Sequence, residues 1–303
     1  MGLLHALHRN VKTIAMPLAM AVGAVLYRPL ATLEAGAHGM ITPTFIFIML
    51  FVTFCRVEPR QMRFSRLHLW LLVCQFVGCA VVYLSLRWID PVLAQGGLIC
   101  VLAPVAMAAV VIGGMLGANV TTMASFNLIS NLAVAVVAPV ILAWVGAAHC
   151  TFGGILSRVG TLLVLPFVAA QLCRWLLPRV AQWVAGYGQI SFYVWLLSLV
   201  FVIGRTTTFI LDLESADPLS EVVFALVALV ICLAQFRVGR ALGARYGDPA
   251  AGGQSFGQKN TILAVWMAQS FLDPISSIAP TAYIIWQNLV NSYQLWRHDR
   301  IRG

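Results

Sequence analysis

The sequence predicts an all-α integral membrane protein with ten transmembrane helices, and composition and the lengths of the apolar runs are the two reasons. Of the 303 residues, 61% are hydrophobic and 10% are charged, and the mean hydropathy is +0.90. A soluble domain carries about 25% charged residues. Because a helix needs about 20 apolar residues to cross the bilayer, the chain has room for about ten spans and little else.

The first five helices follow from apolar runs that charges, glycine or proline interrupt. They are predicted at residues 11–32, 39–56, 66–86, 91–117 and 119–145. The first run also has the length of a signal peptide, with Ala21 and Ala24 as small residues that could mark a cleavage site. We favour a retained helix, because the run continues towards Leu33 and the helix count is then even.

The last five helices are predicted by the same rule at residues 151–173, 184–204, 218–236, 253–272 and 274–296. Ten helices divide into two sets of five, residues 1–145 and 146–303. Because five is odd, the second set enters the membrane from the opposite side, which gives an inverted repeat. The helices that begin at Asn119 and Pro274 share polar residues at i, i+3 and i+4 spacing, namely Asn127, Ser130 and Asn131, and Asn288, Asn291 and Ser292. Hydrogen bonding between packed helices is an alternative reading of these residues.

The distribution of Lys and Arg predicts an inner-membrane protein with both termini in the cytoplasm. Connecting segments on one side hold fourteen cations: Arg9, Lys12, Arg56, Arg60, Arg63, Arg66, Arg174, Arg179, Arg237, Arg240, Arg245, Arg297, Arg300 and Arg302. The opposite segments hold three, Arg28, Arg87 and Arg205, with the acidic residues Asp212, Glu214 and Asp217. Short basic segments stay in the cytoplasm. The net charge of +9 is therefore assigned to lipid contacts and not to nucleic acid.

The seven cysteines are predicted to be buried free thiols. They lie mostly inside apolar runs, without the C-x-x-C spacing or the His/Cys grouping of a metal site. They are Cys55, Cys74, Cys79, Cys100, Cys150, Cys173 and Cys232. We therefore expect no metal and no cofactor.

Two predicted spans contain residues that weaken a helix, and they mark the candidate binding site. The fourth span contains Pro104, Gly113, Gly114 and Gly117, and the ninth contains Gly252, Gly253 and Gly257 before Gln258, Lys259 and Asn260. Interrupted helices in corresponding places of two halves line the substrate sites of transporters, because unwound backbone offers unpaired amides and carbonyls.

Lys259 is the main anomaly of the sequence. An ammonium in mid-span costs about 2.5 to 3.5 kcal/mol, so it needs a partner, water or neutralisation. No carboxylate is predicted at its depth, which leaves backbone carbonyls, water or a bound anion. A lysine that snorkels to the interface, or lies in a polar helix junction, is the structural alternative. Arg158 is read as an interfacial anchor.

Three segments resemble the bile acid:sodium symporter family: Cys74-Gln75-Phe76, Ala103-Pro104, and Gly257-Gln258-Lys259-Asn260. The resemblance covers most of the chain in helix number and order. It implies a core of helices 3–5 and 8–10, in which the discontinuous helices 4 and 9 cross near the midplane. It also implies a panel of helices 1, 2, 6 and 7, and organic anions as substrates.

The departures from that family concern its sodium sites. Ala109-Val110 stands where the family usually has Ser-Asn, and its fifth-helix hydroxyl positions fall on Met123 and Asn127. Ser255 replaces a glutamate, and Lys259 replaces a glutamine. Together the last two changes raise the local formal charge by two units, and Na⁺ should not share a pocket with a protonated lysine.

The sequence thus predicts a secondary transporter of small organic anions that works by alternating access, without sodium, with Lys259 as a tethered cation. The residues expected to line the site are Lys259, Gln258, Asn260, Ser255, Asn127, Asn131, Gln75 and Asn288. Proton coupling at Lys259, uncoupled uniport and a purely structural cation all stay open. The alternatives are a sodium-coupled symporter, an intramembrane enzyme and a structural membrane subunit.

Overall fold

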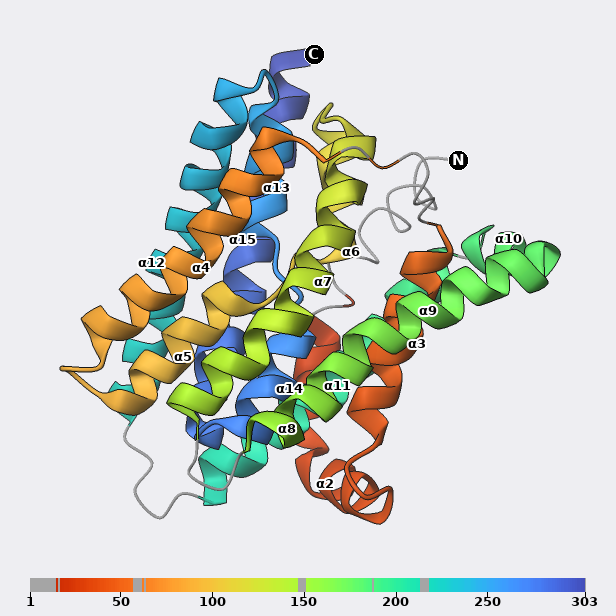
Figure 1. The fold of residues 1–303 in the computed structure, drawn as a ribbon. Helices are drawn as coiled ribbons and strands as arrows, with labels where there is room; N and C mark the ends of the chain where they lie inside the picture. Colours follow the sequence, from red (N-terminus) through yellow and green to blue (C-terminus); the bar gives the residue numbers. More distant parts are fainter. Residues whose placement is uncertain are drawn as a thin grey trace, which may run out of the picture.

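The computed structural model describes residues 15, 17–56, 62, 64–146, 151–186, 188–212 and 218–302, and this part of the chain is helical (Figure 1). A helix at Pro17–Val25 comes first. The remaining α-helices are α2 (Tyr27–Gly36), α3 (Ile41–Cys55), α4 (Arg66–Leu86), α5 (Pro91–Leu102), α6 (Met107–Met115), α7 (Val120–Val145), α8 (Phe152–Ile155), α9 (Thr161–Leu176), α10 (Pro178–Gly186), α11 (Gly188–Asp212), α12 (Pro218–Arg245), α13 (Pro249–Gly257), α14 (Thr261–Phe271) and α15 (Ile278–Arg302). The all-α class is confirmed for these residues.

Several predicted boundaries need correction. The first span is bent by 78° between Pro17–Val25 and α2. The short helix α10 occupies a segment predicted as a loop. Helix α11 continues to Asp212, so Arg205 lies in a helix and not in a connecting segment. Helix α12 likewise continues past residue 236 to Arg245. Several residues named in these predictions lie outside the described residues, namely Arg9, Lys12, Arg60, Arg63, Cys150, Glu214 and Asp217.

The described helices agree with a membrane protein. Four of them are long and apolar enough to span a bilayer: α4, α7, the run Phe152–Leu176 and the run Leu219–Arg245. The bent pair before α3 would make a fifth. Shorter apolar helices include α3, α5 and α14. The count of ten spans and the repeat layout stay predictions.

Both predicted helix breaks exist, but each spans only a few residues and does not include all of the glycines from which it was predicted. Helix α5 ends at Leu102 because a residue before proline is pushed into extended backbone, and Ala103 has φ −50° and ψ 135°. Gly113 and Gly114 lie inside α6 and do not interrupt it. In the second half, Gly252 and Gly253 are helical, and the break comes at residues 258–260 between α13 and α14.

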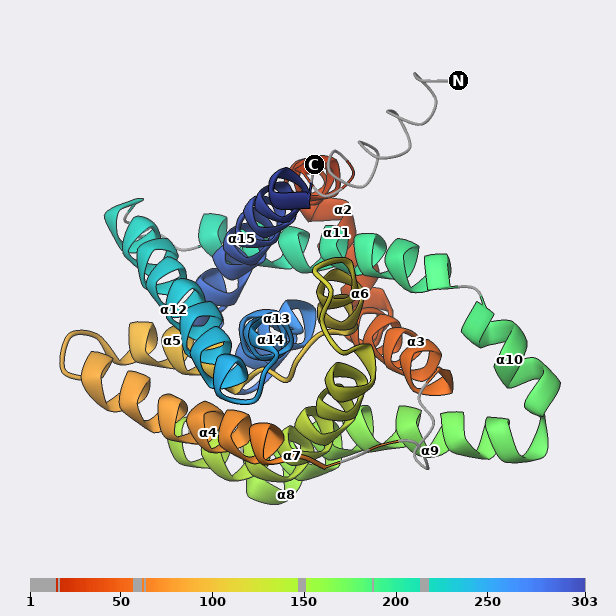
Figure 2. The same ribbon diagram turned by 90° about the horizontal axis from the view of Figure 1, so that it is seen from above.

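Helices α13 and α14, which flank the second break, lie at the centre of the molecule. Seen from above, α13 and α14 are surrounded by α12, α5, α4, α7, α6 and α15 (Figure 2). Helix α12 packs on α13 and α15, and α4 packs on α5. We call α4–α7 and α12–α15 the inner group. Helices α2, α3, α9, α10 and α11 form the flanking group, in which α3 packs on α9 and α11 packs on α2 and α3.

Aspartate side chains cap the N-termini of α5 and α13, the helices that precede the two breaks. Asp90 accepts a hydrogen bond from the Leu93 amide at 2.6 Å before α5, and Asp248 accepts one from the Ala251 amide at 2.8 Å before α13. Each aspartate precedes a proline, which suits the first turn of a helix because it has no N–H to leave unpaired. The second Asp248 oxygen accepts the Asn119 amide at 2.7 Å and so ties the α6–α7 turn to α13.

Candidate functional site

The two helix breaks cross and hydrogen-bond to each other in the middle of the inner group. The Ala106 amide donates to the Gln258 carbonyl at 3.0 Å, and the Asn260 amide donates to the Pro104 carbonyl at 2.8 Å. Val105 and Lys259 lie opposite each other in this antiparallel bridge. The residues that the sequence assigned to a site are therefore brought together from distant parts of the chain.

Lys259 is buried at the crossing and does not snorkel. Only 2% of its surface is exposed. Its Nζ donates to the Val101 carbonyl at 3.0 Å and lies 5.2 Å from the centroid of the Phe256 ring. Its backbone amide donates to Gln287 Oε1 at 3.0 Å. The ammonium thus meets a backbone carbonyl, as one of the sequence readings expected, and the snorkelling reading is wrong.

Other side chains cap the same end of α5, where the last carbonyls have no partner within the helix. Gln75 Nε2 donates to the carbonyls of Leu102 at 2.9 Å and Ala103 at 3.1 Å. Gln235 Nε2 donates to the Cys100 carbonyl at 3.3 Å. Together with Lys259, these groups supply donors to the negative end of the α5 dipole.

Polar residues of α7 contact the first break. Asn127 Nδ2 donates to the Val105 carbonyl at 3.1 Å, and Asn131 Nδ2 donates to the Asn127 carbonyl at 2.7 Å. The Val105 amide donates to Ser130 Oγ at 3.3 Å. The side-chain oxygens of Asn127 and Asn131 are buried and have no hydrogen-bond partner among the described residues. The predicted polar face of α7 therefore points at the crossing with unused acceptor capacity.

Polar residues of α15 contact the second break. Asn291 Nδ2 donates to Gln258 Oε1, and Gln254 Nε2 donates to Asn291 Oδ1 at 2.9 Å. Gln287 contacts the Lys259 amide as described above. Asn288 does not join this site, because its Nδ2 donates to the Ile284 carbonyl of its own helix at 2.6 Å. The role of Asn288 therefore stays a prediction, while Gln287 and Asn291 of the same helix make the contacts with the second break.

Two further predicted residues have different surroundings. Ser255 is buried inside α13 with 4% of its surface exposed. Asn260 is half-buried, and its Oδ1 accepts the Leu263 amide at 3.3 Å, which caps α14. Asn260 is thus the one member of the 257–260 motif that is not fully buried.

Sequence reasoning missed Gln235, Gln287 and Tyr283. The Tyr283 hydroxyl donates to the Gly257 carbonyl at 2.8 Å and receives a hydrogen bond from Gln235 Nε2 at 3.2 Å. A polar residue inside an apolar run was the available signal for each of them, whereas Gln75 was predicted from the family resemblance of the Cys74-Gln75-Phe76 segment. The six cysteines within the described residues are free, as predicted. Cys55, Cys79, Cys100 and Cys232 are also buried, but Cys74 and Cys173 are only half-buried, so the prediction of burial is wrong for these two.

Comparison with known proteins gives one informative match. No protein-family model matches the chain. Over 129 residues the chain is 31% identical to the protein named "Putative symporter YfeH" from Escherichia coli strain K12. The match covers 40% of this chain and 38% of that protein, so the chain spans less than half of the length of the relative. Together with the apolar helices, this similarity supports a multi-pass membrane protein of symporter type and favours a transporter over an enzyme.

Proposed function

We propose that this protein is a secondary transporter that carries small organic anions across the inner membrane by alternating access. Crossed, broken helices with a polar lining are the arrangement that secondary transporters use for their substrate sites. The similarity to a protein named as a symporter and the resemblance to the bile acid:sodium symporter family support the same class. The inner and flanking groups of helices would correspond to the core and the panel of that family.

Lys259 would take the place of a bound sodium ion, and its position carries this part of the proposal. Its Nζ lies 3.0 Å from the Val101 carbonyl at the end of α5, where the helix dipole favours a cation. Three of the four positions that match the family's first sodium site are apolar here, because Ala109, Val110 and Met123 are buried in one hydrophobic cluster. The fourth, Asn127, keeps a polar side chain. A second cation beside the ammonium would be repelled by several kcal/mol at an effective dielectric near 20.

The proposed class of substrate follows from the N-termini of the two helices that come after the breaks. Helices α6 and α14 both begin at the crossing, and a helix N-terminus carries a partial positive charge that favours anions. Asn260 is half-buried there, and its side-chain oxygen is the atom that caps α14. Its amide nitrogen is therefore the donor that we assign to a substrate carboxylate.

Corresponding residues of the two halves support the inverted repeat of residues 1–145 and 146–303. Asp90-Pro91 and Asp248-Pro249 begin α5 and α13 with the same cap. Asn127 and Asn131 of α7 contact one break, and Gln287 and Asn291 of α15 contact the other with the same i, i+4 spacing.

The test is uptake of labelled carboxylates into liposomes that contain the purified protein, with sodium replaced by potassium. We expect uptake without sodium in the parent and its loss in Lys259→Ala, because that variant leaves the Val101 carbonyl without its cation. Unchanged recovery of the labelled compound inside the vesicle separates a carrier from an enzyme.

The matched variant is Lys259→Gln, which restores the residue that the family usually has at this position. If the ammonium replaces sodium, Lys259→Gln should recover part of the lost uptake only when sodium is present. Strict sodium dependence of the parent protein would instead favour the sodium-coupled symporter and would contradict the role given to Lys259.

A further inference from the structure

One side of α15 changes along its length from apolar to aromatic to basic. Ile285 and Leu289 come first, with 38% and 55% of their surfaces exposed. Tyr293 and Trp296 follow at 57% and 53%, and Arg300 is exposed one turn later. Steps of three and four residues place these five side chains on the same side of the helix. We call this side the outer face of α15.

The opposite side of α15 is fixed in the inner group. Tyr283 and Ile284 are fully buried, and Asn291 is 3% exposed. Trp286 Nε1 donates to the Ala225 carbonyl of α12 at 2.9 Å. The outer face therefore belongs to a helix whose orientation is set by its packing, and none of the five exposed side chains is needed to hold it in place.

The depth of the outer face in the membrane follows from the position of the crossing. Gln287 lies at the level of the crossing, because its Oε1 accepts the Lys259 amide at 3.0 Å. Trp296 and Arg300 come nine and thirteen positions later, which is about 14 and 20 Å along the helix axis. Half of the hydrocarbon thickness is about 15 Å. With the crossing near the midplane, as the family resemblance implies, the aromatic rings lie at the edge of the hydrocarbon and Arg300 lies among the lipid headgroups.

The leaflet follows from the distribution of cations, which assigns this end of α15 to the cytoplasmic side. Figure 1 shows the same end projecting at the top of the molecule. The cytoplasmic leaflet carries the anionic lipids that attract Lys and Arg near the surface. The outer face thus ends in arginine on the side where anionic headgroups are found.

Arg300 is held against the aromatic pair. Its guanidinium carbon lies 4.6 Å from the centroid of the Trp296 ring. The Trp296 ring lies 6.0 Å from the Tyr293 ring, with 33° between the two planes. A guanidinium over an aromatic ring gains a cation–π contact and keeps its N–H edge available for an acceptor. The stack orders the cation before a ligand binds, which lowers the entropic cost of binding.

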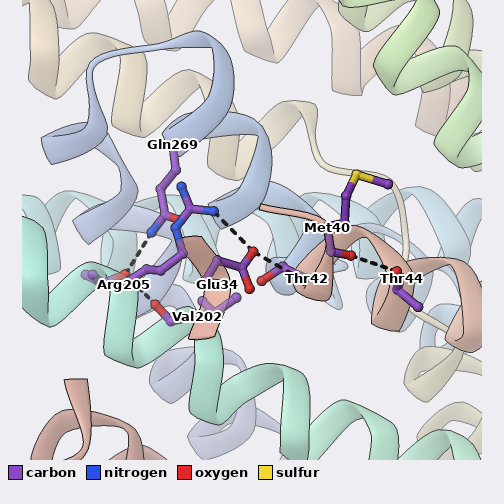
Figure 3. Close-up of polar contacts among 8 residues, drawn as sticks. Glu34, Met40, Thr42, Thr44, Val202, Arg205 and Gln269 are labelled. Carbon is purple, nitrogen blue, oxygen red and sulfur yellow. Dashed lines mark hydrogen bonds and ion pairs between the residues drawn. The ribbon is translucent and has the colours of Figure 1, made fainter. Parts of the chain in front are cut away.

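The arginines of this face make no ion pair within the part of the chain that the structure describes. Arg297 is exposed one turn before Arg300 and lies on the same side of the helix. Figure 3 shows the contrasting case of Arg205, whose NH1 lies 3.7 Å from Oε1 of Glu34. The side chain of Asp299 lies outside the described residues. The positive charge that remains favours an anionic partner from outside the chain.

We propose that the outer face of α15 binds one anionic phospholipid of the cytoplasmic leaflet. An acyl chain lies along Ile285 and Leu289, and the headgroup phosphate accepts hydrogen bonds from Arg297 and Arg300. The planar guanidinium suits a phosphate because it donates two parallel hydrogen bonds. This inference goes beyond the proposed function, since it assigns a lipid partner and does not depend on what the protein carries.

The order of chemistry along the face favours a lipid over other anionic partners. A phospholipid has an apolar chain at hydrocarbon depth and a phosphate at the depth of the headgroups, in the same order as the outer face. A soluble acidic protein cannot contact Leu289, which lies about 3 Å along the helix from the level of Gln287. Free phosphate would leave the apolar part of the face unused.

The test is native mass spectrometry of the purified full chain in detergent, titrated with phosphatidylglycerol and separately with phosphatidylcholine of the same acyl chains. We expect one phosphatidylglycerol to bind about tenfold more tightly than phosphatidylcholine, whose headgroup carries its own cation. Arg300→Gln should weaken the binding of phosphatidylglycerol about fivefold, and Arg297→Gln combined with Arg300→Gln about twentyfold. Raising the salt concentration should weaken it further.

The matched control removes the same charge from another helix end. Arg237 and Arg240 are exposed near the end of α12, and the structure records no aromatic ring under either guanidinium. Arg237→Gln combined with Arg240→Gln should therefore leave the affinity for phosphatidylglycerol within about twofold. Trp296→Leu keeps an apolar side chain and removes the ring under Arg300, so it should weaken the binding.

Each variant is first compared with the parent by size-exclusion profile and by melting temperature without added lipid. Should the double variant at Arg297 and Arg300 not fold, Arg300→Lys replaces it, with an expected affinity between those of the parent and Arg300→Gln. Equal affinities for the two lipids, or an equal loss in the α12 control, would overturn the proposal. So would displacement of the lipid by inorganic phosphate or glycerophosphoglycerol at millimolar concentration, because the acyl chain would then contribute nothing.

Discussion

At the scale of single residues, the central feature is how side chains satisfy the backbone of a broken helix. A helix that ends inside a bilayer leaves carbonyls that water cannot reach, and each unsatisfied one costs several kcal/mol. Lys259, Gln75 and Gln235 donate to three neighbouring parts of the α5 end. These side chains therefore have a structural role whether or not they also touch a substrate.

Gln75 gives a test of this role in stability. We expect Gln75→Ala to lower the free energy of unfolding by about 1 to 3 kcal/mol, because the carbonyls of Leu102 and Ala103 lose their donor. Val77→Ala on the exposed face of the same helix is the control and should change stability little. Thermal unfolding in detergent compares the two, and equal melting temperatures would show that the Gln75 contacts contribute nothing.

Residue types in the sequence predicted part of this site and not all of it. Helical spacing indicated Asn127 and Asn131, the interrupted ninth span indicated Gln258 and Lys259, and the family resemblance indicated Gln75. The structure joins all five at the crossing. Asn288 carried the same signal, yet it bonds to its own helix. Which side of a helix faces a partner is decided by packing, and spacing alone does not reveal it.

At the scale of elements, boundaries with a local cause were predictable. Helix α4 begins after Ser65, whose side chain accepts the His68 amide, and α5 ends where Pro104 forbids its continuation. The second break has no proline. It is held by pairing with the first break, so the sequence predicted it over a longer segment, from Gly252 to Asn260, than the residues 258–260 that are not helical. Helix α10 was missed because nine residues with polar members do not form an apolar run.

The glycines of α13 are explained by close packing and not by flexibility. Helices α12 and α13 approach so closely that a Cβ on Gly252 would meet the Gly239 carbonyl oxygen and Gly243 Cα. A Cβ on Gly253 would meet Arg240 Cβ at 3.4 Å, which is ordinary contact. Small residues at such positions let membrane helices approach each other.

Gly252→Ala should therefore be destabilised by about 1 to 3 kcal/mol, because the added methyl group must push apart two backbones. Gly253→Ala is its matched control and should unfold at nearly the parent temperature. Melting curves in one detergent decide the matter. A similar decrease in the melting temperature of both variants would mean that helix propensity or flexibility, and not the α12–α13 contact, accounts for the glycines.

At the scale of the whole molecule, the flanking and inner groups must separate at one end and then at the other if alternating access occurs. In the present structure, α11 packs on α14 near the expected external side, and the Gln269–Thr206 hydrogen bond lies in this contact. Beside it, Thr206 of α11 also contacts Thr281 of α15, with 3.4 Å between their hydroxyl oxygens. Because these two side chains are in contact, we choose their positions for a pair of cysteines that could be cross-linked by a disulfide.

We therefore expect that Thr206→Cys combined with Thr281→Cys, in a background with the native cysteines replaced by alanine, stops uptake when it is oxidised. The cross-link would hold α11 against α15 and prevent the external end from opening, so only a fraction that escaped oxidation would remain active. Dithiothreitol should restore uptake, and the oxidant should not change the uptake of either single cysteine variant. Full uptake by quantitatively cross-linked protein would mean that α11 and α15 move together, and that the moving boundary lies elsewhere than between these two groups.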